Sequence, residues 1–221
     1  MSYLDFLAVH GLRLAGGVVV TVQQTVLAAI LAVVIALVVG LMRLSPNAAV
    51  RGAATCYIEI FRGTSLLIQL YWIFFVLPLF GLTLEKFVAG FVAVGMNLGA
   101  YGAEVVRGAI QAVPRGQYEA ALALNLSPWT RMRRIILPQA FLIMLPPWGN
   151  LLIELLKATA LVALISVTDL MFQAKQINGY TFLSAEAFGT ALVIYYVMAR
   201  LLISPSMRWL EGVMARKLGR A

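Results

Sequence analysis

The sequence predicts an all-α, polytopic membrane protein that crosses the bilayer with five transmembrane helices. Of its 221 residues, 62% are hydrophobic and only 12% are charged, and the mean hydropathy is +0.92. Soluble domains usually carry about 45–50% apolar and about 25% charged residues, so an ordinary soluble enzyme and a disordered chain are both excluded. Five stretches with little or no charge have the length, roughly 20 residues, that a helix needs to cross the hydrocarbon core. A helix is expected for each stretch because a chain in lipid must satisfy its backbone hydrogen bonds internally.

Short polar connections separate the predicted spans. The turn formers Ser45, Pro46 and Asn47 follow the first span and predict a turn and a helix cap. Arg200 is the only charge in the fifth span, and we expect its side chain to reach the nearer membrane surface. The five spans are 14–42, 63–84, 87–103, 135–153 and 187–207.

The charge balance predicts how the chain is oriented. Seventeen Lys and Arg residues against nine Asp and Glu residues give a net charge of +8. Most of the basic residues lie in connections on one side, which marks the cytoplasmic side of a membrane protein. We therefore expect the N-terminus outside and the C-terminus in the cytoplasm, with the basic segment 208–220 resting on the inner leaflet as an amphipathic helix. No nucleic-acid partner is expected, because the bases sit between long apolar runs.

Residues 114–134 form the longest predicted cytoplasmic connection and read as two short helices. Pro114 precedes the first helix, and Asn125 is suited to the left-handed residue that ends it. Ser127 is placed to cap the second helix, with Pro128 at its first position. Two interpretations remain open at this point: an amphipathic surface loop, or a rigid helical handle that fits the groove of a partner.

This connection resembles the signature loop of ABC importer permeases. That signature reads Glu-Ala-Ala, three residues, Gly, nine residues, Ile, any residue, Leu-Pro. Asn125 stands where the signature has glycine, a replacement that the backbone permits because both residues tolerate positive φ. Segments 57–78, 100–121 and 155–167 are similar to the polar amino-acid branch, the histidine, glutamate, glutamine, arginine and opine permeases. The residues that fall in register are Glu119, Ala120, Ala121, Ile135, Leu137 and Pro138.

The resemblance implies a type I ABC importer permease architecture in the bacterial inner membrane, with residues 1–221 as one transmembrane domain and 114–134 as its cytoplasmic coupling loop. It implies the transmembrane subunit of an ATP-driven, binding-protein-dependent importer for a polar amino acid or a related compound. The implied partners are a cytoplasmic ABC ATPase dimer, a second permease subunit, identical or paralogous, and an extracytoplasmic solute-binding protein. Independently, the chain has no G-x-x-x-x-G-K-[ST] sequence, so ATP hydrolysis would belong to another polypeptide. The residues in register, with Asn125, would couple to that ATPase.

Four polar residues inside the predicted spans or at the outer end of the fourth are candidates for binding substrate. Glu154 and Lys157 are three residues apart, and Asn150 precedes Glu154 by four, so the three share one helix face. Asn97 lies near the middle of the third span. A carboxylate accepts from an ammonium group, a lysine donates to a carboxylate and an amide does both, which suits a zwitterionic amino acid. The alternative is structural: a helix-end ion pair with interhelical amide hydrogen bonds.

Other polar and small residues have structural interpretations. Glu59 with Arg62 and Glu104 with Arg107 are spaced for ion pairs along a helix. Asp169 is expected in a solvated segment outside the membrane. Small residues at helical spacing in the third span predict close packing against another helix. These residues are Gly95, Gly99 and Gly102.

The residue census disfavours a membrane enzyme. His10 is the only histidine and Cys56 the only cysteine, so one chain cannot assemble a zinc or iron site from such side chains. His10 also precedes the first span, where it could not complete a Ser-His-Asp set. We expect no cofactor and no metal. The alternative to a transport subunit is a small membrane channel or scaffold protein with a basic cytoplasmic face.

Overall fold

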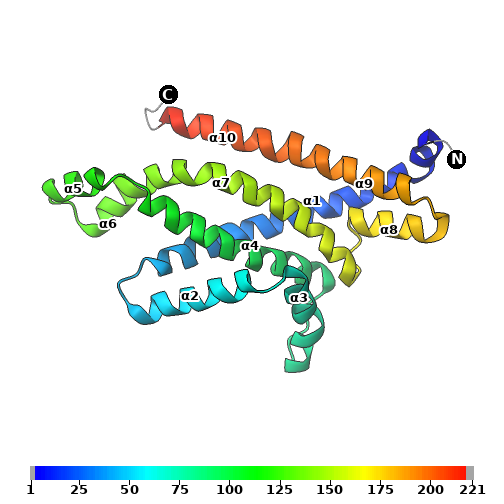
Figure 1. Ribbon diagram of the computed structural model, residues 1–221, viewed down its shortest axis with the longest axis horizontal. Coiled ribbons are helices and arrows are strands. Elements are labelled where there is room, and N and C mark those ends of the chain that lie inside the picture. The colour runs from blue at the N-terminus through cyan, green and yellow to red at the C-terminus, as the bar shows by residue number, and fades with distance from the viewer. Residues whose placement is uncertain (1–2, 218–221) are drawn as a thin grey trace.

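The computed structural model describes residues 3–217, which form helices and connections with no strand in that range. The long helices lie roughly along one axis, with the N-terminus at one end and the C-terminus toward the other (Figure 1). Four of them are long and apolar enough to cross a membrane, and a pair of shorter helices bent by 104° makes a fifth span if it is counted as one. The all-α prediction is confirmed. The four long helices are Tyr3–Arg43, Lys86–Gln111, Pro128–Ile165 and Ser184–Met214.

The centre of the bundle is the contact between α1 (Tyr3–Arg43) and α4 (Lys86–Gln111). A Cβ atom added at Gly95 would lie 2.9 Å from the side chain of Leu31, and one at Gly99 would lie 2.8 Å from Ile35. There is no room for either atom, so the predicted small-residue face of the third span does permit close helix packing. At Gly102 the added atom would meet Trp148 at 2.8 Å, which brings α7 (Leu137–Ala158) against the same face.

The second predicted span differs from the structure. Helix α2 (Ala48–Gly63) begins directly after Asn47, whose side chain accepts a hydrogen bond from the amide of Ala49 at 2.9 Å, so the predicted cap is confirmed. The chain then turns by 104° into a second helical segment instead of running straight from 63 to 84. This segment comprises α3 (Leu66–Tyr71), the wide turn η1 (Trp72–Val76) and η2 (Leu77–Phe80), and it leaves the bundle at a steep angle (Figure 1).

Side-chain hydrogen bonds explain why the chain can break there. Gln69 donates to the carbonyl of Phe61 at 2.9 Å and to the hydroxyl of Thr64 at 2.6 Å. The carbonyl of Phe61, near the end of α2, thereby gains a hydrogen-bond partner although the helix does not continue. A helix that breaks within a membrane span needs such a partner for each freed carbonyl.

The fourth span is longer than predicted. Segments α6 (Pro128–Arg131), η3 (Met132–Ile136), α7 and η4 (Thr159–Ile165) follow one another without a gap, and α7 continues through Pro146 and Pro147. The run ends at Ser166, whose φ of 62° lies in the left-handed region. Helix α8 (Leu170–Thr181) then begins.

The prediction that Asp169 lies in a solvated segment is wrong. The residue is fully buried, and its carboxylate caps α8 by accepting from the amide of Phe172 at 2.9 Å. Tyr195 donates its hydroxyl to the other carboxylate oxygen at 3.2 Å. The sequence alone does not reveal this burial, because residues far along the chain provide it.

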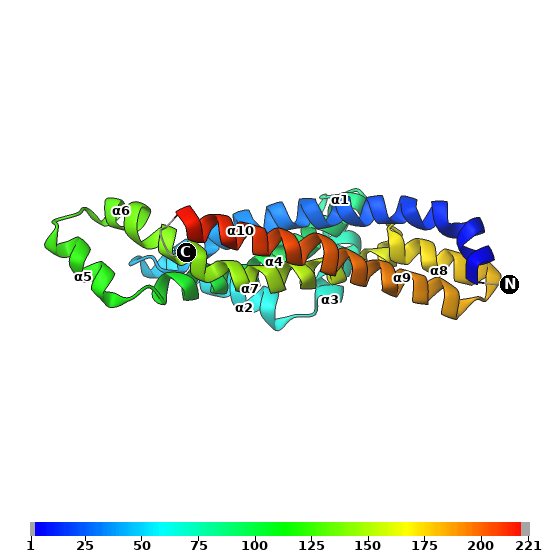
Figure 2. The same cartoon turned by 90° about the horizontal axis from the view of Figure 1, so that it is seen from above.

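The part of the predicted helix 208–220 that the structure describes, 208–217, is helical, but it is not a separate element. Helix α9 (Ser184–Met198), the wide turn η5 (Ala199–Ile203) and α10 (Ser204–Lys217) form one continuous rod (Figure 2). The helix is not interrupted where the predicted surface helix would begin, at Arg208. Met207 lies over Gly149 of α7, and this contact holds the rod against the bundle. Residues 218–221 lie outside the described part of the chain.

Candidate functional site: a coupling loop and a polar face of the fourth span

The first helix of the coupling loop, residues 114–134, ends as the sequence predicts. Helix α5 (Arg115–Ala123) is followed by Asn125 with φ of 54°. The amide of Leu126 donates to the carbonyl of Ala121 at 3.0 Å, and that of Asn125 to Leu122 at 2.8 Å. These two bonds are those of a Schellman motif, which needs a left-handed residue at this position. Asn125 therefore performs the conformational role of the glycine in the signature.

The second helix of the coupling loop is capped and tied to the bundle. The hydroxyl of Ser127 accepts from the amide of Thr130 at 3.3 Å, and Pro128 is the first helical residue, as predicted. Gln139 of α7 donates to the side chain of Gln117 in α5 at 3.1 Å. The helix pair therefore lies at a defined position at one end of the molecule, beyond the ends of the long helices (Figure 1).

The fold brings the two halves of the signature together. Ala120 and Ala121 from α5 and Ile135 and Pro138 from the start of the fourth span line one hollow of about 490 Å³. Glu119 is exposed on α5. Several large apolar side chains of the loop are exposed without cover in this chain, which is typical of a surface that meets a partner. These are Leu122, Leu124 and Trp129, exposed by 59%, 71% and 70%.

The predicted polar face of the fourth span is exposed. Asn150, Glu154 and Lys157 all lie on the surface of α7, and none of them makes a hydrogen bond or an ion pair with another described residue. The sequence allowed Glu154 and Lys157 to pair, but within residues 3–217 they do not. Charges without a protein partner on a membrane span need water, a ligand or another subunit beside them.

This polar face lies level with the middle of the uncharged stretch of α1. Leu152 of α7 and Val33 of α1 line the same hollow, and the two helices run in opposite directions. Counting five residues on from Leu152 places Lys157 level with about residue 28 of α1, because both helices rise by about 1.5 Å per residue. Residue 28 is the midpoint of the uncharged stretch 14–42.

Asn97 has a different environment from the residues on α7. It is buried, and its amide donates to the carbonyl of Phe61 at 2.9 Å and to the side chain of Gln69 at 3.0 Å. Both of its hydrogens are therefore used at the break between α2 and α3. The sequence did not single out Gln69, although an amide inside an apolar span is a signal of such a role.

One of the two predicted ion pairs is present. Arg107 contacts Glu104 at 2.7 Å, and Arg43 approaches the same carboxylate at 3.8 Å from the end of α1. The other pair, Glu59 with Arg62, does not form within the described residues. The guanidinium of Arg62 instead lies 5.2 Å from the ring centre of Tyr101, where a cation–π contact replaces the ion pair.

Comparisons with known proteins decide the family. Residues 20–219 match the model of the binding-protein-dependent transport system inner membrane component. The chain belongs to this family. A probable amino-acid ABC transporter permease of Sinorhizobium fredii is 47% identical over 95% of this chain and 92% of its own. The L-cystine transport system permease TcyB of Bacillus subtilis is 35% identical over 94% of this chain and 87% of its own.

The fold of this permease has a solved counterpart. The crystal structure of an amino acid ABC transporter with histidines matches it with a TM-score of 0.86 and 34% identity, covering 98% of this chain and 99% of the other. The chain is therefore a multi-pass inner-membrane transport component with the type I ABC importer permease fold. This result supports a transport subunit over the alternative, a channel or scaffold protein. Among residues 3–217, no three His, Cys, Asp or Glu side chains gather where they could hold a metal ion.

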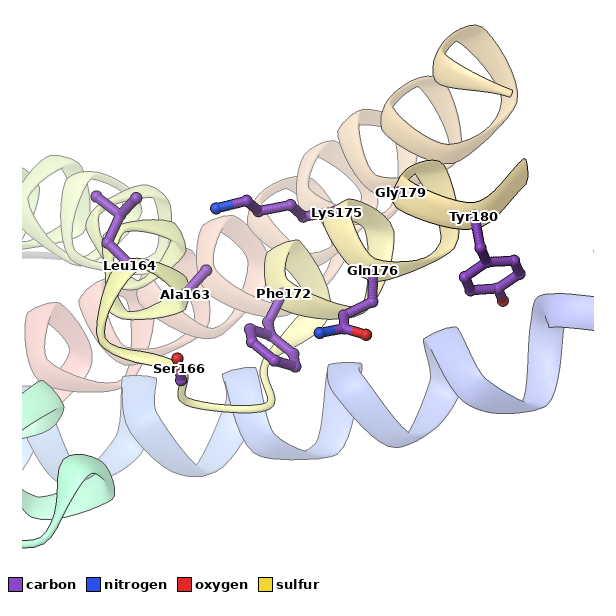
Figure 3. A pocket seen from close by; sticks show the side chains of 8 residues that line it. All are labelled: Ala163, Leu164, Ser166, Phe172, Lys175, Gln176, Gly179 and Tyr180. Atoms are coloured by element: carbon purple, nitrogen blue, oxygen red, sulfur yellow. The ribbon is translucent and has the colours of Figure 1, made fainter. Parts of the chain in front are cut away.

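The end of the permease opposite the coupling loop carries another hollow, of about 490 Å³. Phe172, Gln176 and Tyr180 extend from α8 toward α1, while Lys175 reaches in the direction of Leu164 (Figure 3). Arg13 of α1 donates to Gln173 at 2.7 Å and so ties α8 to α1. This end is thus a partly polar surface, the platform, in which α8 is hydrogen-bonded to α1.

Proposed function

We propose that this permease forms the translocation path of an ATP-driven, binding-protein-dependent importer for a polar amino acid or a related compound. The observation that carries the proposal is the geometry of the coupling loop. Two capped helices, joined by a left-handed Asn125 and anchored to α7 through Gln117 and Gln139, present exposed apolar side chains at one end of the molecule. A loop with this geometry can transmit a push or a pull to the fourth span as a rigid body.

The proposed partners follow from the two ends of the permease. A cytoplasmic ABC ATPase dimer receives the coupling loops through Glu119 and the residues in register, so this end faces the cytoplasm with the C-terminus. The N-terminus and α8 then face outward, where the platform around Lys175 is available to the solute-binding protein. A second permease subunit, identical or paralogous, covers the exposed polar face of α7. The names of the relatives, which describe amino-acid and L-cystine permeases, support an amino acid as the solute.

The proposed solute path runs along the polar face of α7. Glu154 is placed to accept hydrogen bonds from the ammonium group of an amino acid, and Lys157 to donate to its carboxylate, with Asn150 beside them. Their exposure on a long apolar helix supports this role, because lipid alone would leave two charges unsolvated there. Asn97 contributes indirectly, because its amide holds the break of the second span.

Glu119→Lys tests the coupling role. We expect uptake of amino acids by cells or proteoliposomes to fall by more than tenfold, because the reversed charge opposes docking of the ATPase. The same variant should lose co-purification of an ATPase. Membrane insertion should be unchanged, because Glu119 is exposed and makes no bond within the described residues. Uptake is measured with radiolabelled solute and insertion by immunoblot of membranes.

The matched control is Glu85→Lys, the same charge reversal at an exposed residue just before the opposite end of α4. It should retain uptake and co-purification. Undiminished uptake in the Glu119 variant would contradict the coupling role. So would labelling of a cysteine at position 119 from outside intact cells.

A further inference from the structure

A hollow between the fourth and fifth spans contains a cation that the path described above does not use. It has a volume of about 530 Å³, within the range of about 300–1,000 Å³ that is typical of ligand sites. Lys157 lines it from α7, and Arg200 lines it from the wide turn η5. The remaining lining is mainly apolar or aromatic: Ile153, Ala160, Leu192, Tyr195, Tyr196, Ala199 and Ser204.

Neither cation has an anionic partner within residues 3–217. No ion pair or hydrogen bond is formed by Arg200 or by Lys157. Glu154, three residues before Lys157 on the exposed face, does not contact either of them in an ion pair. Asp169 lies behind Tyr195, and its two oxygens are occupied by the Tyr195 hydroxyl and the Phe172 amide.

The hollow lies away from the ends of the long helices. Lys157 is level with the middle of the uncharged stretch of α1, and Arg200 lines the same hollow. The sequence suggested that Arg200 is close enough to a helix end to reach the surface. In the structure Arg200 lies at the centre of a rod that extends from Ser184 to Met214. Both side chains are exposed in the single chain, and two like charges on one mainly apolar hollow favour an anion between them.

The backbone at Arg200 is also unusual. Ala199–Ile203 form a wide π-turn, and the hydroxyl of Ser204 donates to the carbonyl of Ala199 at 3.2 Å. Such turns inside α-helices occur frequently at functional sites. Pro205, which follows, has no amide hydrogen to donate and so contributes to the local widening.

We propose that Arg200 and Lys157 together bind a carboxylate of the transported solute, so that the path favours solutes with a negatively charged side chain. This inference rests on the proposed function. Glu154 would hold the ammonium group, and the two cations would hold the carboxylates, Arg200 through its planar two-pronged guanidinium. A lipid phosphate shares this oxyanion chemistry, so the test includes phosphatidylglycerol.

Glutamate and glutamine distinguish the proposal, because they differ only in a side-chain carboxylate against an amide. The purified permease complex in neutral detergent is heated with each compound at the same concentration. We expect glutamate to raise the Tm by roughly 3–5 °C and glutamine by less than half as much. Arg200→Gln should abolish the additional rise in Tm that glutamate gives over glutamine. Arg200→Lys should retain most of this difference. Arg208→Gln, which removes the same charge from an exposed position on the same rod, should leave it unchanged.

Equal stabilisation of the unaltered complex by glutamate and glutamine would overturn the proposal. The proposal would also be overturned if Arg200→Gln kept the full difference in Tm shift between glutamate and glutamine. A shift that depends on Arg200 but appears with phosphatidylglycerol rather than with glutamate would also overturn it in favour of a lipid site. Failure of the proposed function is separate, since it appears as loss of uptake and of ATPase co-purification, whereas this measurement needs neither the binding protein nor ATP.

Discussion

At the scale of single residues, the most consequential side chains are polar groups whose partners lie far away in the chain. Gln69 and Asn97 are 28 residues apart, and together they bind the end of α2. Asp169 caps α8 and also accepts from Tyr195. In each case a backbone or side-chain group that would be expensive to leave unpaired away from water gains a partner. Gln69, Asn97 and Asp169 therefore act at helix breaks and helix starts, whereas the polar residues exposed on α7 have no partner in the described chain.

Asp169 makes stability depend on pH. Burial raises its pKa to about 6, although hydrogen bonds from the Phe172 amide and the Tyr195 hydroxyl act in the opposite direction. Between about pH 4 and pH 6 the folded protein keeps a proton that the unfolded chain has lost, so stability falls as pH rises through this window, by at most about 3 kcal/mol. We expect Asp169→Asn, which still caps α8, to remove this dependence in thermal melts of the purified protein.

The comparison variant is Glu85→Gln, which removes an exposed carboxyl group. Its melting temperature should follow the same pH curve as the unaltered protein. A curve for Asp169→Asn that still falls between pH 4 and pH 6 would show that another group causes the effect.

At the scale of elements, the packing of α1 on α4 depends on missing side chains. Gly95 and Gly99 let α4 approach Leu31 and Ile35 within distances that a Cβ atom cannot occupy. Close approach matters more in a membrane than in water, because lipid and side chains are equally apolar and association depends on van der Waals contact and hydrogen bonding. The α1–α4 pair is then a rigid core against which the fourth span can move.

Gly99→Ala should destabilise the permease, because the added methyl group would lie 2.8 Å from Ile35. Overpacking of this kind typically costs about 1–3 kcal/mol, which exceeds the gain of roughly 0.5–1 kcal/mol from replacing a helical glycine. Gly108→Ala is the control on the same helix, because a Cβ atom there meets nothing within 4 Å. It should be neutral or slightly stabilising. Thermal melts in detergent compare the two, and equal melting temperatures would contradict the packing argument.

At the scale of the whole molecule, the coupling loop and the polar face of α7 belong to one continuous element. The chain runs without a gap from Pro128 through Leu137 to Ile165, so a displacement of the loop acts on the same helix that carries Glu154. This continuity supports alternating access, in which closure of the ATPase pair moves the loop and the helix tilts as a rigid lever. In the proposed transporter, a partner permease would complete the path along α7.

Glu154→Gln separates transport from ATP hydrolysis at this scale. We expect uptake of a cationic or zwitterionic amino acid to fall by more than tenfold, because the amide lacks the negative charge that attracts an ammonium group. Basal ATP hydrolysis by the assembled transporter should change less than twofold, since Glu154 lies in α7 and not in the coupling loop. Equal loss of both activities would indicate a structural defect instead of a lost solute contact.

The coupling loop shows how far local sequence reaches. Asn125, Ser127 and Pro128 act on their nearest neighbours along the chain, and each takes the conformation or cap that its chemistry predicts. The same holds for Asn47 and for the apolar length of the spans, because capping and hydrophobic length are properties of contiguous residues. Helical class and the capped loop were therefore determined by the sequence alone.

Tertiary structure alone decided the features that join distant residues. The 104° break of the second span depends on Gln69, which Asn97 also contacts, and the burial of Asp169 depends on α1, α8 and α9 meeting. The packing of the continuous rod from α9 to α10 against α7 depends on Met207 lying over Gly149. The shared hollow of Lys157 and Arg200 needs two antiparallel spans to be adjacent. No local pattern encodes such pairings, because the free energy that selects them comes from packing and hydrogen bonds between segments far apart in the chain.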